Sequence, residues 1–173
     1  MASVLDLDPR WRALMARGGV IDIGFDHPSE WPHAARDEQP LVKAGEDQLT
    51  AELCRVGTSR YIRAALTLPI RGSDDTVGIA IWVEAAPATF YAYLDTFEGS
   101  PAPAATVATL ANDLPPIAEL GAGLSLDFGE GTARPAATLA GTVDMSLDDL
   151  ITLYEASGTL TRDDLRNTQQ SDG

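Results

Sequence analysis

The chain has 173 residues, of which 45% are hydrophobic and 22% are charged. These proportions are typical of a globular protein and exclude a disordered or fibrous chain. Its single cysteine excludes an internal disulfide and a zinc site built from paired cysteines. No stretch approaches the ~18–20 uncharged apolar residues of a membrane span, and the first residues lack the apolar core of a signal peptide. We therefore expect a cytoplasmic protein without membrane contact.

The net charge of −14 is concentrated in one part of the chain. Residues 72–161 contain thirteen acidic residues and a single basic one, Arg134, whereas most basic residues lie in the first 71 positions. A segment of this charge repels phosphate, so we expect no nucleic-acid binding. The acidic surface serves either solubility or the attraction of a basic protein partner, and composition leaves both interpretations open.

The first predicted element is a short helix. It begins at Asp8-Pro9, because Asp is a good N-cap and Pro is tolerated at the first helical position, and it ends at Gly18-Gly19. Weak alternation over 20–25 predicts a strand.

The segment 26–40 is rich in Pro and charge, which predicts an ordered loop pinned by Trp31. His27 and His33 lie in this loop and form a candidate loop site together with Trp31. Histidines six residues apart match no standard ligand spacing, so we predict no metal there and interpret both as packing or surface residues.

Two alternating runs, 61–70 and 76–84, are separated by a short glycine-containing loop and predict a β-hairpin. A strand over 49–56 is expected to precede it. Within that strand, Cys54 alternates with apolar residues, which favours a buried thiol over a nucleophile.

One face of the hairpin is apolar and is expected to join the core, whereas the other carries Arg63, Trp82 and Glu84 among small residues. These three form a candidate binding face. The favoured interpretation is a structural ion pair across the two strands, and the alternative is that Arg63 orients an anionic group while Glu84 acts as acid or base.

The remaining pattern predicts further elements and a fold class. The expected elements are a helix over 87–97 with Phe90, Leu94 and Phe97 on one face, a strand or helix over 106–112, a strand over 124–128, an edge strand over 135–143, a helix over 146–158 with a capping box at its start, and a short helix over 161–166. Together they predict a single α+β domain over 1–166, with a mainly antiparallel sheet around the central hairpin and flanking helices on one side. Residues 167–173 are expected to form a flexible tail.

Familiar catalytic patterns are missing from the sequence. The chain contains no dinucleotide fingerprint, no phosphate loop and no Gly-x-Ser-x-Gly elbow. We therefore predict no cofactor and lean away from an enzyme.

Three short motifs, Tyr61-Ile62-Arg63, Leu68-Pro69-Ile70 and Trp82-Val83, follow Cys54 in the order seen in the uncharacterised bacterial family DUF2199, which the chain resembles from about Gly24 to Gly158. Many members carry a paired-cysteine segment that is absent here, and a His-Pro where this chain has Asp144-Met145-Ser146. Any role that depends on those residues cannot be transferred. The resemblance implies a shared fold and no established activity.

Two functions fit these observations. The first is a small acidic protein-binding module, immunity-like or antitoxin-like, that neutralises a basic partner. The alternative is a small-molecule-binding protein or small enzyme that uses the semi-polar face of the 61–84 hairpin.

Overall fold

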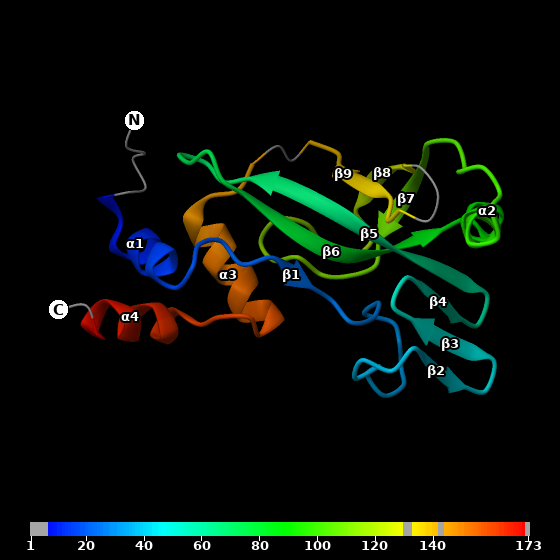
Figure 1. Cartoon of the computed structure of the whole chain (residues 1–173), viewed down its shortest axis with the longest axis horizontal. Helices are drawn as coiled ribbons and strands as arrows, with labels where there is room; N and C mark the ends of the chain where they lie inside the picture. The colour runs from blue at the N-terminus through cyan, green and yellow to red at the C-terminus, as the bar shows by residue number, and fades with distance from the viewer. Residues whose placement is uncertain (1–6, 130–132, 142–143, 172–173) are drawn as a thin grey trace.

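The computed structural model describes residues 7–129, 133–141 and 144–171 and shows a mixed α/β architecture with a sheet-rich core (Figure 1). Its elements follow the chain in this order: α1 (Pro9–Ala16), β1 (Ile23–Gly24), β2 (Leu41–Ala44), β3 (Asp47–Thr50), β4 (Leu53–Val56), β5 (Ser59–Pro69), β6 (Thr76–Ala85), α2 (Pro87–Thr96), β7 (Thr106–Leu110), β8 (Gly123–Asp127), β9 (Ala136–Leu139), α3 (Leu147–Ser157) and α4 (Arg162–Ser171).

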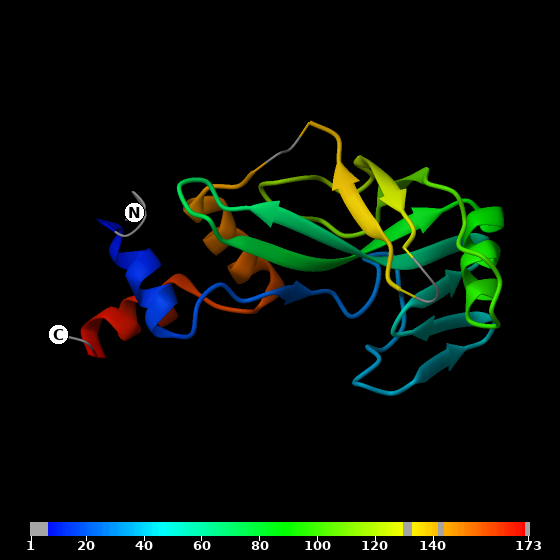
Figure 2. The ribbon, with the colours of Figure 1, turned by 45° about the horizontal axis from the view of Figure 1, so that its top comes forward.

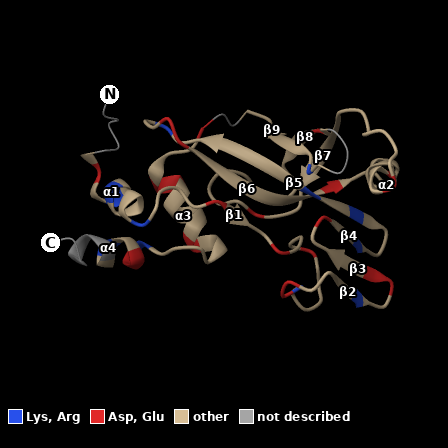
Figure 3. Ribbon diagram, in the orientation of Figure 1, with Lys and Arg blue, Asp and Glu red and all other residues tan. Residues whose placement is uncertain are grey.

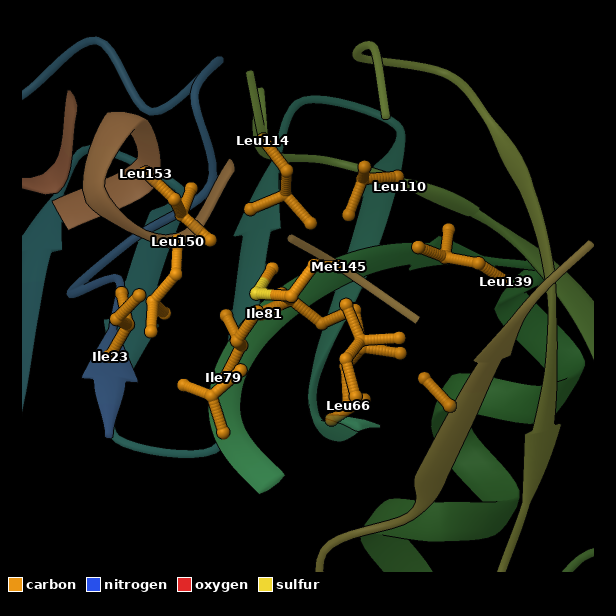
Figure 4. Close-up of a cluster of buried hydrophobic side chains, with 14 of the residues drawn as sticks. Ile23, Leu66, Ile79, Ile81, Leu110, Leu114, Leu139, Met145, Leu150 and Leu153 are labelled. Carbon is orange, nitrogen blue, oxygen red and sulfur yellow. The ribbon is translucent and has the colours of Figure 1, made fainter. Parts of the chain in front are cut away.

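The predicted hairpin is present as β5 and β6, which pair antiparallel from Arg60 opposite Ala85 to Pro69 opposite Thr76. Burial alternates along both strands, as their sequence pattern predicts. The buried inward set is Ile62, Ala64, Leu66, Leu68, Val77, Ile79, Ile81 and Val83. Figure 4 shows Leu66, Ile79 and Ile81 of this set facing Leu110, Leu139 and Met145 from other elements.

The sheet is closed, which corrects the expectation of a sheet with helices on one side. Strands β6, β7, β8 and β9 pair antiparallel in sequence, and β9 then pairs in parallel with β5, so five strands form a ring. The prediction of an edge strand over 135–143 is wrong for its described part, because β9 lies between β5 and β8. Residues 142–143 lie outside the described residues. Closure leaves the ring strands without a long exposed edge.

Additional strands extend the sheet beyond the ring. The expected strand over 49–56 is two strands, β3 and β4, which continue with β2 as an antiparallel meander from the start of β5. Strand β1 pairs in parallel with β6, with Gly24 opposite Ala80. In Figure 2 this meander lies below the barrel at the same end as α2.

The helices lie at both ends of the barrel (Figure 1). Asp8 caps α1 as predicted, and Ser146 and Asp149 form the predicted capping box of α3, which ends at Gly158 in the left-handed conformation. Helix α4 continues to Ser171, beyond the predicted end of that helix. Within the described residues, none of the helices combines the length and apolar character needed to cross a bilayer.

Helix α2 departs from its predicted apolar face. Phe90 is buried, whereas Leu94 and Phe97 are exposed, and Tyr93 and Thr96 take the inward positions instead. The helix therefore packs with a face rotated from the predicted one.

A second, smaller core lies on the outer face of the hairpin, separate from the barrel interior. It contains the buried residues Trp31, Leu49, Cys54, Tyr61, Trp82 and Ala111. The loop over 26–40 and the β2–β4 meander thus cover the hairpin face on which the candidate binding residues lie.

Candidate functional site

Trp82 is a core residue of the outer hairpin face. Its side chain is fully buried, and its indole Nε1 donates a hydrogen bond of 2.8 Å to the carbonyl oxygen of Phe25. Its backbone N–H donates to Oδ1 of the buried Asn112 at 2.7 Å, and Asn112 Nδ2 donates to the carbonyl oxygen of His27. These bonds attach the loop after β1 to β6. The indole is therefore a packing residue, and no face of it is exposed to solvent.

The candidate loop site is held by three separate contacts. Trp31 is 4% exposed, and its Nε1 donates to the carbonyl oxygen of Ala34. The ring of His27 contacts the carbonyl oxygen of Pro28 at 2.7 Å. His33 lies edge-on to Trp31, with ring centroids 4.9 Å apart, and its Nε2 contacts Asp47 of β3. The two histidines therefore do not share a partner.

His33 and Asp47 tie the loop to the meander. Nε2 of His33 lies 2.8 Å from Oδ2 of Asp47, and this contact, followed by a hydrogen bond from the Gly57 N–H, lowers the pKa of Asp47. In the part of the chain that the structure describes, no group of three or more His, Cys, Asp and Glu side chains is arranged to hold a metal ion.

Cys54 lies in the second core and is 1% exposed. Burial, with a smaller effect of Asp47, raises the pKa of its thiol to about 12. The thiol is therefore neutral near pH 7, which agrees with a packing role and not with a nucleophile.

Arg63 lies across from Trp82 in the paired strands, and its guanidinium carbon is 5.8 Å from the centre of the indole. This half-buried side chain donates one long hydrogen bond, 3.4 Å from Nη1 to the carbonyl oxygen of Ala51. Its Nε is shielded from solvent and has no hydrogen-bond partner among the described residues. A cation–π contact is common for arginine, whereas a shielded Nε–H without a partner is rare and calls for an explanation beyond packing.

Two further arginines, each beside a carboxylate, influence the charge of Arg63. Arg36 lies 3.8 Å from Asp26 in an ion pair, and Arg134 makes a bidentate pair with Glu52 at 2.6 and 2.9 Å. Burial lowers the pKa of Arg63, and Arg134 and Arg36 lower it further, while Glu52 and Asp26 act in the opposite direction. We call these five side chains the arginine cluster.

Sequence reasoning identified Arg63 but missed the other four members of this cluster. They come from the loop over 26–40, the turn between β3 and β4, and the segment before β9, so no local pattern connects them. Arg134, 71 positions beyond Arg63, comes beside β5 because β9 closes the barrel against it, and Arg36 is held by Asp26 in the loop after β1.

Glu84 does not join Arg63. It lies opposite Tyr61 in the hairpin and lines a separate groove of about 500 Å³ with Arg60, Pro87 and Val107. Within the described residues, no ion pair links Glu84 to Arg63, so the favoured interpretation as a cross-strand ion pair is wrong for this pair.

The acidic segment over 72–161 contributes a second candidate surface. Several of its carboxylates pair with arginines, including Asp144 with Arg71 and Asp148 with Arg10. In Figure 3 acidic positions are spread over loops and helices, whereas basic positions on β2, β4 and β5 gather at the end of the molecule near α2.

One part of the acidic segment forms a concave surface. The loop between β7 and β8 lines an open depression of about 1150 Å³ with Asp113, Glu119 and the half-exposed Leu120, together with Pro115, Pro116 and Ile117. No ion pair engages Asp113 or Glu119 within the described residues. We call this surface the acidic hollow.

A family model described as an uncharacterized protein conserved in bacteria (DUF2199) matches residues 17–148. Neither the search of curated proteins nor the search of solved structures returns a match.

Proposed function

This chain belongs to the DUF2199 family of uncharacterised bacterial proteins, and we propose that it functions as an acidic protein-binding module for a basic partner. An immunity-like or antitoxin-like role, in which the module occludes the site of a basic toxin, is the form of this function that we favour. The observation that carries the proposal is the acidic hollow, a broad concave surface with two carboxylates that no ion pair engages among the described residues.

The composition of the hollow fits a protein partner better than a small ligand. Pro115, Pro116, Ile117 and Leu120 supply apolar area, and Asp113 and Glu119 supply charge at the same surface. Protein interfaces combine an apolar centre with charged groups that select the partner, and a depression this open buries too little of a small molecule. The excess negative charge of the segment speeds association with a positively charged protein.

The test is affinity capture from the native cell extract at low and high salt, with the protein and a double variant, Asp113→Lys with Glu119→Lys. We expect a basic protein that the unmodified protein retains at low salt, releases at high salt, and fails to retain when both carboxylates are reversed.

A matched control separates the hollow from the overall charge. Glu46→Lys with Glu98→Lys changes the net charge by the same amount at two exposed positions outside the hollow. This variant should still capture the partner. Equal loss in both double variants would show that net charge alone drives capture, and retention by the hollow variant would contradict the proposal.

A second candidate is small-molecule binding on the outer hairpin face, and the unused donors of Arg63 favour it. An enzymatic form of this candidate in which Glu84 assists Arg63 is not favoured, because the two side chains belong to different surfaces. The arginine cluster is therefore the surface on which this candidate depends.

A further inference from the structure

The guanidinium of Arg63 lies against a floor of very small residues. A Cβ built on Gly24 of β1 would be 3.2 Å from Nη2 of Arg63 and 3.9 Å from the Cβ of Ala80. A side chain at position 24 would therefore require the guanidinium to shift by a few tenths of an ångström. The absence of a side chain at Gly24 is what allows Arg63 to extend across β6 toward β1.

The donors of the arginine cluster exceed its acceptors. A guanidinium has five N–H donors, and Arg63 uses one of them in a hydrogen bond at the long limit of 3.4 Å. Nε of Arg36 is likewise shielded and has no hydrogen-bond partner among the described residues, because Oδ1 of Asp26 is 3.8 Å away. Arg63 and Arg36 thus each have an unused, shielded Nε–H. The segment from Gly24 to Asp26 links them, because Gly24 lies against Nη2 of Arg63 and Asp26 pairs with Arg36.

The cluster has one uncompensated positive charge. Asp26 accompanies Arg36 and Glu52 accompanies Arg134, whereas the described residues place no carboxylate in an ion pair with Arg63. This local excess stands out in a chain whose net charge is −14. Anions are recognised where planar arginine donors meet in partly desolvated surroundings.

We infer that Arg63 and Arg36 bind the carboxylate group of a small ligand. A carboxylate carries the single negative charge that balances the cluster, and its two oxygens match the planar donors of a guanidinium. A phosphate monoester brings close to two negative charges and would overcompensate the site. This inference rests on the second candidate function and is independent of the protein partner.

Entry of the carboxylate requires a movement of Arg36. Both Nε atoms are shielded, and Arg36 belongs to the loop over 26–40, where its Nη1 donates to the carbonyl oxygen of Gln39 at 2.6 Å. The side-chain contact of Arg36 with Asp26 is long, at 3.8 Å from Nε to Oδ1, whereas the backbone N–H of Arg36 donates to Oδ2 of Asp26 at 2.8 Å. The ligand carboxylate therefore becomes the closer partner of the Arg36 guanidinium, and Asp26 keeps its bond to the backbone. Trp82 stays in place beneath the guanidinium of Arg63.

The experiment is a titration of the ¹⁵N-labelled full chain followed through the arginine Nε–Hε resonances. Benzoate is the probe, benzamide is its neutral counterpart, and inorganic phosphate is a third arm, all at matched ionic strength. We expect saturable shifts of the Arg63 and Arg36 resonances with benzoate and no comparable shift with benzamide or phosphate.

Variants locate the effect. Arg63→Gln should weaken benzoate binding at least tenfold, and Gly24→Ala, which keeps every charge, should weaken it by displacing the guanidinium. Arg71→Gln removes an exposed arginine paired with Asp144 and should leave the affinity unchanged. Should Arg63→Gln fail to fold, Gly24→Ala still tests the site.

Three results would overturn the inference in distinguishable ways. Equal binding of benzamide at Arg63 would refute specificity for a carboxylate. The proposal that this face binds small molecules would still stand. Saturation by phosphate alone would refute the charge argument. The site itself would be refuted if benzoate caused no saturable shift at Arg63 or Arg36. It would also be refuted if both Arg63→Gln and Gly24→Ala left benzoate binding intact.

Discussion

Replacement of Arg63 by Met separates a structural role of this side chain from a binding role. Met retains an unbranched stem beside Trp82 but removes the charge and all N–H donors. The change loses a cation–π contact of about 0.5–2 kcal/mol and one long hydrogen bond worth at most about 1 kcal/mol.

The same replacement also removes unfavourable terms. A buried donor without a partner costs about 1–3 kcal/mol, and Arg63 has such a donor at Nε. Repulsion by Arg134 and Arg36 disappears as well, together with the attraction of Glu52 and Asp26. Gains and losses cancel, so we expect the free energy of unfolding to change by less than about 1 kcal/mol, with binding of benzoate lost.

Urea unfolding followed by far-UV circular dichroism measures this change as a shift of the midpoint at constant slope. Trp82→Ala is the comparison, because truncation of a fully buried indole costs about 3–5 kcal/mol. A loss of more than about 2 kcal/mol in Arg63→Met would refute the reasoning. It would show that Arg63 holds the fold together and that its donors are not available to a ligand.

Three further outcomes follow from local contacts. Ellman's reagent at about pH 8 should modify Cys54 only after unfolding, because the raised pKa keeps the thiol neutral, and stoichiometric reaction of the folded protein would contradict this. The folded pKa of Asp47 is lowered, chiefly by His33, so this carboxylate contributes stability that is complete above its unfolded pKa of about 3.9 and is lost as the pH falls through the folded pKa. Asp47→Asn should therefore reduce the dependence of the unfolding free energy on pH in that range, as measured by urea unfolding at several acidic pH values. Ser146→Ala should lower the free energy of unfolding in urea by about 1 kcal/mol. An unchanged midpoint would show that the capping bond between Ser146 and Asp149 does not stabilise the protein.

Local patterns predicted the elements that depend on neighbouring residues. The alternation of 61–70 and 76–84 was sufficient for the hairpin, and Ser146 with Asp149 was sufficient for the start of α3. Closure of the barrel depends instead on the pairing of Ala65 and Leu66 with Ala136 and Ala137. Small residues that pair across a large sequence separation leave no periodic signature, so the ring could not be read from the chain.

The candidate binding face was predictable only in part, and the direction of one side chain explains why. Strand periodicity correctly placed Arg63, Trp82 and Glu84 on one face. The guanidinium of Arg63 lies toward Gly24, which pairs with Ala80, whereas Glu84 lies two positions beyond Trp82 in the opposite direction along β6. Residues that share a face therefore separate into two surfaces, and the long side chain of Arg63 decides which one it joins.

The acidic hollow and the arginine cluster predict responses to salt of different size, which allows one chain to test both proposals. Attraction between the hollow and a basic partner acts over distances that salt screens, since the Debye length is about 8 Å at physiological ionic strength. A small carboxylate is repelled at long range by the net charge of −14 and held at short range by Arg63. Raising NaCl from about 0.05 to 0.3 M should therefore reduce partner capture at least about tenfold and change the benzoate affinity less than about threefold. A benzoate affinity that falls in parallel with partner capture would show that long-range charge, and not the contacts of the arginine cluster, controls both events.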